Sequence, residues 1–216
     1  MILLTGFEPF GGESFNPSWA AAQQAADALA AAGLPAMAVL LPVEFGSSGE
    51  VLAAALAEAR THGTVDLVVA VGQAGGTEQL ALERVAVNID DARIPDNAGH
   101  SPIDVPVAAG GPAAYFATLP VKACLAALSG AGIPARVSQT AGTFVCNHVF
   151  YALMDQLSGQ PGTRGGFVHV PYAPEQVAGG TAPSMDVARM ARGLEIIART
   201  ALGTTTDIPL AAGATH

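Results

Sequence analysis

The sequence predicts one layered α/β domain, residues 1–216, built on a largely parallel sheet. Short apolar runs of strand length alternate with longer helical patterns, which is typical of α/β folds. The segment Val65–Val71 is rich in valine, as are strands that are buried on both faces of a parallel sheet. The length suits one domain with a large core, and neither a linker nor an internal repeat is visible.

The elements follow in order from local patterns. The strand Ile2–Thr5 leads into a loop rich in glycine and phenylalanine. Asn16-Pro17-Ser18 then opens a helix over Trp19–Ala31, because proline is tolerated in the first turn. The remaining expected elements are the strand Ala36–Leu41, the helix Ser48–Thr61, the strand Val65–Val71, the alternating stretch Leu80–Asp90, the loop Arg93–Pro106, the helix Thr118–Leu128, the strands Ala135–Gln139 and Gly166–Val170, and the helix Met185–Leu202. We expect the tail from about residue 203 to be frayed, because it has little to bury.

The composition excludes several classes of partner. Charged residues make up only 12% of the chain, and the formal net charge is −9. This balance argues against nucleic acid and against an anionic membrane surface, since both need a basic face. The low charge suggests surface buried between subunits, although alanine-rich helices also raise the apolar fraction.

The location expected by default is the cytoplasm. The longest apolar runs are far shorter than the roughly 20 residues that span a bilayer, and the start of the chain lacks the pattern of a signal peptide. Two cysteines, Cys124 and Cys146, do not make a disulfide framework. Cys124 lies in an apolar helical stretch and is expected to be core packing, as free cysteines commonly are.

Cys146 is the candidate nucleophile. It lies where a β-like stretch, broken at Gly142, gives way to a helix with an apolar face. A thiol in the first turn of a helix faces unpaired backbone N–H groups and the positive end of the helix dipole, which favour thiolate over thiol. The alternative on local context alone is a small buried apolar residue.

His169 is the better candidate partner for Cys146. It lies in a strand that ends at Pro171, and α/β sheets build their sites at the carboxyl ends of parallel strands. His148 follows Cys146 by two positions and therefore points to a different side of the helix. The alternative for His169 is a structural histidine with satisfied hydrogen bonds.

The charged segment from Glu83 to Arg93 is the next candidate. A carboxylate here can orient the imidazole of a nucleophile–base–orienter set, and Arg93 can bind a carboxylate or a developing oxyanion. The alternative is a solvated edge strand. Which acid points inward stays open at this level, and no zinc-ligand spacing is present.

The loop Gly6–Gly12 follows the first strand, where dinucleotide-binding proteins place their glycines. The glycine spacing is wrong for that motif, and Glu8 puts a negative charge where a pyrophosphate would lie. Phe7 and Phe10 suit a pocket wall for a small, uncharged, polar ligand instead. A tight hydrophobic loop without a ligand is the alternative.

Taken together, these segments resemble the pyroglutamyl peptidase type I (pyrrolidone-carboxylate peptidase) family. They occur in the order of the family and span residues 1 to about 177. The matching segments are Thr5–Gly12 with Asn16-Pro17, Gly72–Gly76, Glu83–Asn88, Asp91–Asn97, Gly142–His148 and His169–Tyr172.

The resemblance implies an α/β/α sandwich, commonly a homotetramer, without metal or organic cofactor. It implies a cysteine peptidase that removes an N-terminal pyroglutamyl (5-oxoprolyl) residue from peptides. Carried over by motif, Cys146 is the nucleophile, His169 the general base and Glu83 its orienting acid. Arg93 matches an arginine near the oxyanion, Phe10 an aromatic wall of the lactam pocket and Gln73 a pocket residue.

Three alternatives to this function stay open at this level. A cysteine hydrolase of the same fold with a different acyl pocket is the first. A nucleotide-binding module would rest on the Gly6–Gly12 loop, and a catalytically dead binding protein would have to retain Glu83, Cys146 and His169 without using them. Glu44, beside a segment expected to border the pocket, departs from the resemblance and leaves the role of that segment open.

Overall fold

The computed structural model describes residues 1–160 and 162–213. Its centre is a six-stranded sheet in the order β2-β1-β3-β8-β4-β7. All neighbouring strands run parallel except β4, which is antiparallel to β8 and parallel to β7. The strands are β1 (Ile2–Phe7), β2 (Ala36–Leu41), β3 (Leu67–Gln73), β4 (Leu80–Glu83), β7 (Ala135–Ser138) and β8 (Arg164–Val170).

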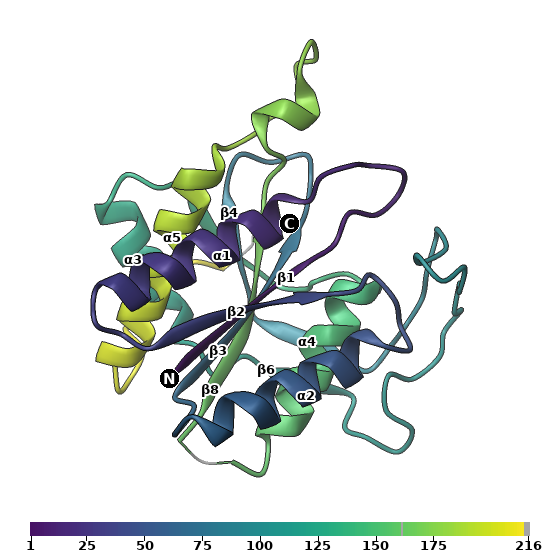
Figure 1. Cartoon of the computed structure of the whole chain (residues 1–216), viewed down its shortest axis with the longest axis horizontal. Coiled ribbons are helices and arrows are strands. Elements are labelled where there is room, and N and C mark those ends of the chain that lie inside the picture. The colour runs from purple at the N-terminus through teal and green to yellow at the C-terminus, as the bar shows by residue number, and fades with distance from the viewer. Residues whose placement is uncertain (161, 214–216) are drawn as a thin grey trace.

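Helices cover both faces of the sheet (Figure 1). On one face lie α1 (Pro17–Ala31), α3 (Val121–Gly130) and α5 (Val187–Gly203), whose apolar residues share one core cluster. On the other lie α2 (Ser48–Thr61) and α4 (Val145–Leu157), whose apolar residues share the second cluster. The predicted α/β/α sandwich with a largely parallel sheet is therefore confirmed.

Most element boundaries lie within three residues of those predicted. The strand Ala36–Leu41 and the helix Ser48–Thr61 are observed with the predicted bounds. Asn16 caps α1, because its side-chain oxygen accepts the backbone N–H of Ser18 at 3.1 Å. Pro17 then occupies the first turn, as expected.

The alternating stretch predicted over Leu80–Asp90 is not one strand. It divides into β4, inside the sheet, and β5 (Val85–Val87), which pairs antiparallel with β6 (Ala114–Phe116) in a separate ribbon. The strand β6 is short and partly exposed, so it carried no clear periodicity. The long connection between β5 and β6 projects at the right of Figure 1 and includes the predicted Arg93–Pro106 loop.

The carboxyl ends of β1, β3 and β8 meet at one edge of the sheet, because these strands are parallel neighbours. The antiparallel β4 brings its own carboxyl end alongside the middle of β8, with Glu83 opposite Phe167 and Ala81 opposite His169. A short 3₁₀ helix, η1 (Pro174–Val177), follows β8 and lies in the green segment at the top of Figure 1. These segments hold the candidate site.

Asp207 and Leu210, in the tail predicted to be frayed from about residue 203, contact the start of α3. The carboxylate of Asp207 accepts the backbone N–H groups of Lys122 and Ala123 at 3.1 and 2.8 Å, as N-terminal helix groups without an intrahelical partner require. Residues 214–216 lie outside the described residues.

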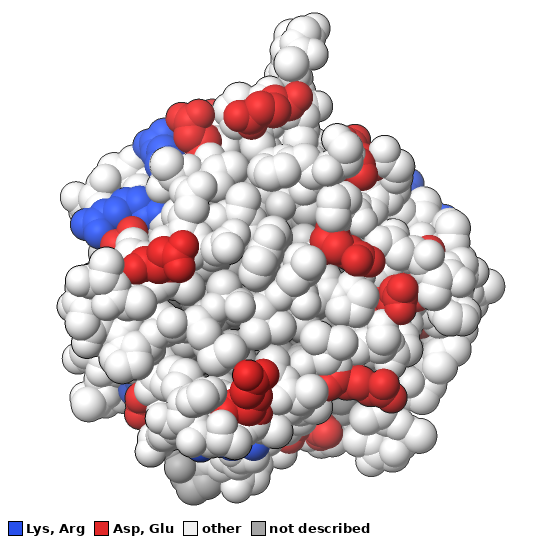
Figure 2. Space-filling view, viewed as in Figure 1, with Lys and Arg blue, Asp and Glu red and all other residues white. Residues whose placement is uncertain are grey.

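The surface is sparsely charged. The face in Figure 2 is mostly uncharged, with scattered acidic residues and few basic ones. No helix among the described residues combines the length and apolar character that crossing a membrane requires.

Candidate active site

Cys146 is the second residue of α4, where the helix presents unpaired donors. The first backbone bond of the helix runs from the N–H of His148 to the carbonyl of Phe144, at 3.1 Å. The N–H groups of Val145, Cys146 and Asn147 therefore have no carbonyl partner within the helix. These donors and the positive end of the helix dipole favour negative charge at Cys146, either on sulfur or on an adjacent oxyanion.

His169 and Glu83 form a buried pair on neighbouring strands. Nδ1 of His169 lies 2.8 Å from Oε1 of Glu83, and the two residues are only 7% and 2% exposed. An ionised carboxylate can only accept, so Nδ1 donates to it and the other ring nitrogen, Nε2, remains for a second partner. The group that faces the other side of the ring is Cys146, whose side chain is close enough to His169 to raise the pKa of the imidazole.

The pKa of His169 reflects these partners. Burial by itself lowers this pKa, but the hydrogen bonds with Cys146 and Glu83 outweigh burial and raise the pKa to about 9. The site thus favours an imidazolium held between a carboxylate and a sulfur. This arrangement suits a cysteine nucleophile whose proton resides on histidine.

A small pocket opens beside Cys146. It is lined by uncharged side chains, and the rings of Phe10 and Phe144 in its wall lie 6.2 Å apart. Phe45 is outside the lining but packs its ring 5.4 Å from that of Phe144. The three residues predicted for the pocket, Phe7, Phe10 and Gln73, are all among the lining residues. The lining is Phe7, Phe10, Asn16, Val43, Gln73, Phe144, Val145 and Cys146. The lining suits a small, uncharged, polar group in its chemistry, but the open space is only about 10 Å³, so a ring enters only if the walls move apart.

Arg93 does not line this pocket. Its side chain is exposed on the connection between β5 and β6. The backbone near it is nevertheless anchored to the start of α4: the N–H of Asp91 donates to the carbonyl of Thr143 at 2.9 Å, and the Thr143 hydroxyl donates to the carbonyl of Asp91 at 2.8 Å. Glu44 also lies outside the pocket and accepts a hydrogen bond from the hydroxyl of Ser47, whereas its neighbour Val43 is in the lining.

Asn147 is a supporting residue that the sequence reasoning missed. Its fully buried amide accepts the N–H of Val87 at 3.0 Å and donates to the carbonyls of Val87 and Ile89, both at 2.9 Å. These three bonds join α4 to β5 and to Ile89, two residues beyond it, immediately beside Cys146. Its position next to the candidate nucleophile was visible in the sequence, but its partners 58–60 positions away were not.

Asp96 is a second missed residue. Burial by itself raises the pKa of this carboxyl, but the backbone N–H groups of Phe45, His100 and Ala98 lower it below its usual range. The bond from Phe45, at 2.9 Å, holds the segment next to the pocket-lining Val43. The turn composition around Pro95-Asp96-Asn97 was the available signal.

His148 and Cys124, the other histidine and cysteine considered from the sequence, do not join Cys146, His169 and Glu83. His148 binds Asp90, with Nδ1 and Oδ2 2.8 Å apart, rather than Glu83. Cys124 is fully buried in the core cluster of α1, α3 and α5, and burial raises the pKa of its thiol to about 12.

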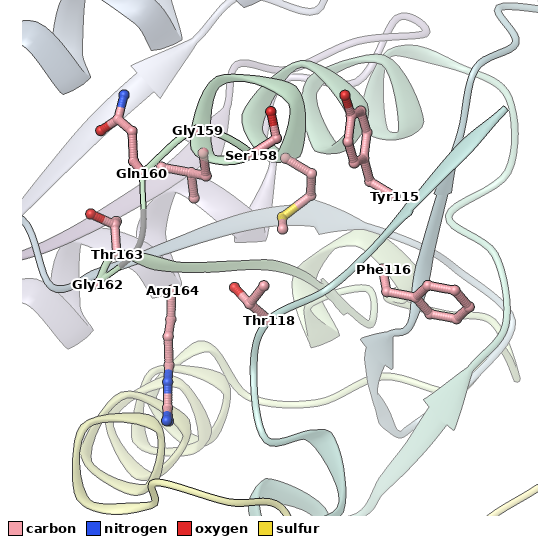
Figure 3. A pocket seen from close by; sticks show the side chains of 11 residues that line it. Tyr115, Phe116, Thr118, Ser158, Gly159, Gln160, Gly162, Thr163 and Arg164 are labelled. Atoms are coloured by element: carbon pink, nitrogen blue, oxygen red, sulfur yellow. The ribbon is translucent and has the colours of Figure 1, made fainter. Parts of the chain in front are cut away.

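A larger hollow lies at the opposite end of the sheet, at the amino end of β8 (Figure 3). Its lining includes Tyr115, Ser158 and Arg164, but none of the residues around Cys146. The Arg164 guanidinium is already bound to the backbone carbonyls of Ala201, Thr204 and Thr205. Within residues 1–160 and 162–213, no group of three or more His, Cys, Asp or Glu side chains is placed to hold a metal ion.

Gly72 is required by the position of Cys146, and its replacement provides a first prediction. A Cβ atom at Gly72 would lie 2.8 Å from Sγ of Cys146 and 2.8 Å from the ring of Phe167. We expect Gly72→Ala to displace the sulfur from His169 and to slow alkylation of Cys146 by iodoacetamide on the order of tenfold. Overpacking should also cost about 1–3 kcal/mol of stability. The measurements are the rate of alkylation and thermal unfolding.

Gly130→Ala is the matched control, because a Cβ atom there meets nothing within 4 Å. Its alkylation rate should equal that of the unmodified chain. An unchanged rate in Gly72→Ala would show that contact with Gly72 does not control the position of the sulfur.

The chain is similar to known proteins over nearly its whole length. The sequence model of the pyroglutamyl peptidase family matches residues 1–204. The pyrrolidone-carboxylate peptidase of Streptomyces coelicolor is 54% identical over 218 residues, covering 100% of this chain and 99% of that protein. The corresponding protein of Clavibacter michiganensis is 52% identical over 212 residues, covering 98% of this chain and 97% of that protein.

Solved structures give the same result. Pyroglutamyl peptidase I from Bacillus amyloliquefaciens superposes with a TM-score of 0.88 at 46% identity, covering 97% of this chain and 98% of that one. Pyrrolidone carboxyl peptidase from Thermococcus litoralis superposes with a TM-score of 0.85 at 35% identity, with the same coverage. The match over nearly the whole chain, in sequence and in fold, shows that this protein belongs to the pyroglutamyl peptidase family.

Proposed function

We propose that this protein is a cysteine peptidase that removes the N-terminal pyroglutamyl residue from peptides through a thioester acyl-enzyme. Cys146 is the nucleophile, His169 the proton carrier and Glu83 the acid that orients it. The observation that carries the proposal is the buried His169–Glu83 pair, hydrogen-bonded at 2.8 Å, beside a cysteine that acts on the pKa of His169 and lines an uncharged pocket. Family membership supports the same reaction.

The pocket supports the choice of acyl group. A pyroglutamyl residue has no α-ammonium group, so its pocket needs no carboxylate to meet a cation. The lining has neither acidic nor basic side chains, and Phe10 and Phe144 offer flat apolar surface for the ring. Substrate residues that lack the lactam would leave polar groups of the site without hydrogen-bond partners. This loss rejects such substrates more strongly than the apolar walls of the pocket can.

Acylation follows from the protonation state favoured by the site. The thiolate of Cys146 attacks the pyroglutamyl carbonyl carbon, and the carbonyl oxygen becomes an oxyanion. The backbone N–H of Cys146, unpaired within the helix, donates to that oxygen. His169 then gives the proton from Nε2 to the leaving amine as the C–N bond breaks, which leaves a thioester on Cys146.

Deacylation uses the same groups in reverse. Neutral His169 takes a proton from water, which attacks the thioester carbon. The C–S bond breaks, pyroglutamate leaves, and Cys146 returns to the thiolate beside protonated His169. Glu83 keeps its bond to Nδ1 throughout, so Nε2 is always the nitrogen that exchanges the proton. Arg93 is proposed as a support for the oxyanion, which requires its exposed side chain to turn toward Cys146 when substrate binds.

The proposal includes the setting of the enzyme. The low content of charged residues and the resemblance to the family support a cytoplasmic homo-oligomer, a tetramer by that resemblance, whose substrates are peptides with N-terminal pyroglutamate. None of the proposed steps calls for a metal or an organic cofactor.

The specificity claim is tested with two fluorogenic substrates, pyroglutamyl-aminocoumarin and prolyl-aminocoumarin. We expect kcat/KM for the pyroglutamyl substrate to exceed that for the prolyl substrate by at least about 10⁴-fold, because the prolyl ring lacks the carbonyl and carries a charge. The measurement is initial rates over a range of substrate concentration.

Equal turnover of both substrates would point to a cysteine hydrolase with a different acyl pocket. Turnover of neither would reject the proposed reaction.

A pyroglutamyl substrate acetylated at the lactam nitrogen should also be cleaved poorly, since the pocket then has to accept a larger ring substituent.

A further inference from the structure

Gln176, in η1, connects three segments at the pocket. Its Nε2 donates to Oε1 of Gln73 at 2.9 Å and to the carbonyl of Phe15 at 3.3 Å, while its Oε1 accepts the N–H of Ala173 at 3.0 Å. Gln73 lines the pocket beside Cys146. Gln176 itself does not line the pocket, so any effect on substrate passes through Gln73.

The chemistry of these partners determines the orientation of the Gln176 amide. The N–H of Ala173 can only donate, so it requires the oxygen of Gln176. The carbonyl of Phe15 can only accept, so it requires the nitrogen. Both constraints place the Gln176 nitrogen toward Gln73.

The orientation of the Gln73 amide follows from this. A nitrogen donor on Gln176 requires an acceptor opposite, and the only acceptor of the Gln73 amide is Oε1. Nε2 of Gln73 is left as a free donor, with no hydrogen-bond partner among the described residues. Asn16, the other amide in the lining, is already engaged with the carbonyl of Glu8 and with Ser18.

We propose that Gln176 is a specificity-determining positioning residue, which holds the Gln73 amide with its N–H donor facing the pocket. That donor selects acyl groups whose ring bears a carbonyl oxygen, the distinguishing group of a lactam. This inference rests on the proposed function and extends it to a residue outside the pocket. An inverted Gln73 amide would present an oxygen to the ring carbonyl and repel it.

The test compares Gln176→Glu with Gln176→Leu, using pyroglutamyl-aminocoumarin. A carboxylate at 176 can only accept, so it attracts Nε2 of Gln73 and turns the Gln73 oxygen toward the pocket. We expect Gln176→Glu to reduce kcat/KM by about tenfold to a hundredfold, chiefly through KM. Gln176→Leu leaves Gln73 free to adopt either orientation and should lose less. A merely structural role would give the opposite order, because leucine loses all three contacts whereas glutamate keeps that with Ala173.

A double-mutant cycle tests whether Gln176 affects substrate binding through Gln73. In a Gln73→Ala background, Gln176→Glu should have no further effect on KM. The rate of Cys146 alkylation by iodoacetamide should be unchanged in Gln176→Glu and Gln176→Leu, which shows an intact Cys146–His169 pair. Gln24→Glu, the same charge change on the exposed face of α1, is the control and should match the wild type.

The inference would be overturned if Gln176→Glu kept the wild-type KM, or if it raised KM as much in the Gln73→Ala background as in the wild-type background. In both cases, cleavage of pyroglutamyl-aminocoumarin by the wild type would still support the proposed function. A wild-type protein that fails to cleave pyroglutamyl-aminocoumarin would overturn the proposed function, and the inference with it.

Discussion

Replacing Cys146 by serine is expected to lower kcat/KM for pyroglutamyl-aminocoumarin by at least about a thousandfold. The serine hydroxyl remains protonated near neutral pH, so His169 no longer faces an anionic nucleophile. The fold should persist, because the substitution is nearly isosteric at a half-buried position at the start of α4. Steady-state kinetics give the loss, and thermal unfolding shows whether the variant is folded.

Cys124→Ser is the matched control for this experiment. Cys124 lies in the core cluster on the opposite face of the sheet, and its Sγ lies 3.8 Å from the carbonyl of Ile197. We expect this variant to lose stability but to keep its intrinsic rate. Persistent activity in Cys146→Ser would refute the assignment of the nucleophile, and a large rate loss in folded Cys124→Ser would refute its assignment to the core.

The second large effect is expected from Glu83→Gln, read from the pH profile. In the wild type, His169 has a pKa of about 9, so the protonated imidazole is present below that pH and is lost as the pH rises through it. Activity should therefore fall on the alkaline side near this value. Glu83 is one of the two groups that raise the pKa, so its replacement leaves burial opposed only by Cys146.

We accordingly expect Glu83→Gln to move the alkaline limb of kcat/KM to lower pH and to reduce its maximum by roughly 10²- to 10⁴-fold. Asp90→Asn is a matched control, because Asp90 is also a buried carboxylate bound to a histidine, His148, at the same distance of 2.8 Å. It should leave the alkaline limb in place. A limb that stays near its wild-type position in Glu83→Gln would exclude His169 as the group that controls it.

Much of the fold was predictable because its signals are local. Parallel strands buried on both faces have continuous apolar segments, so β3 was visible without any partner. The cap at Asn16 and proline at position 17 marked the start of α1 for the same reason. In contrast, β6 and the division of residues 80–90 into β4 and β5 depend on pairing with distant segments, which periodicity does not reveal.

The residues of the candidate site likewise differ in whether a local sequence signal identifies them. Cys146 could be identified locally, since its position at the start of a helix follows from the glycine break and the apolar face after it. Glu83 could not be singled out from the other acids of its segment by its own surroundings, and only the resemblance to a family selected it. In the folded protein, β4 runs antiparallel to β8, and this pairing places the buried carboxylate of Glu83 2.8 Å from His169.

By itself, the sequence determined the layers of the fold, the helix that presents Cys146 and the residue types available for chemistry, because those features depend on neighbours along the chain. The tertiary structure alone decided which carboxylate meets which histidine, that Arg93 is exposed, and that Gln176 orients Gln73 from 103 positions away. These pairings depend on strand order and on hydrogen-bond donors meeting acceptors across the sheet, and no local pattern in the chain encodes either.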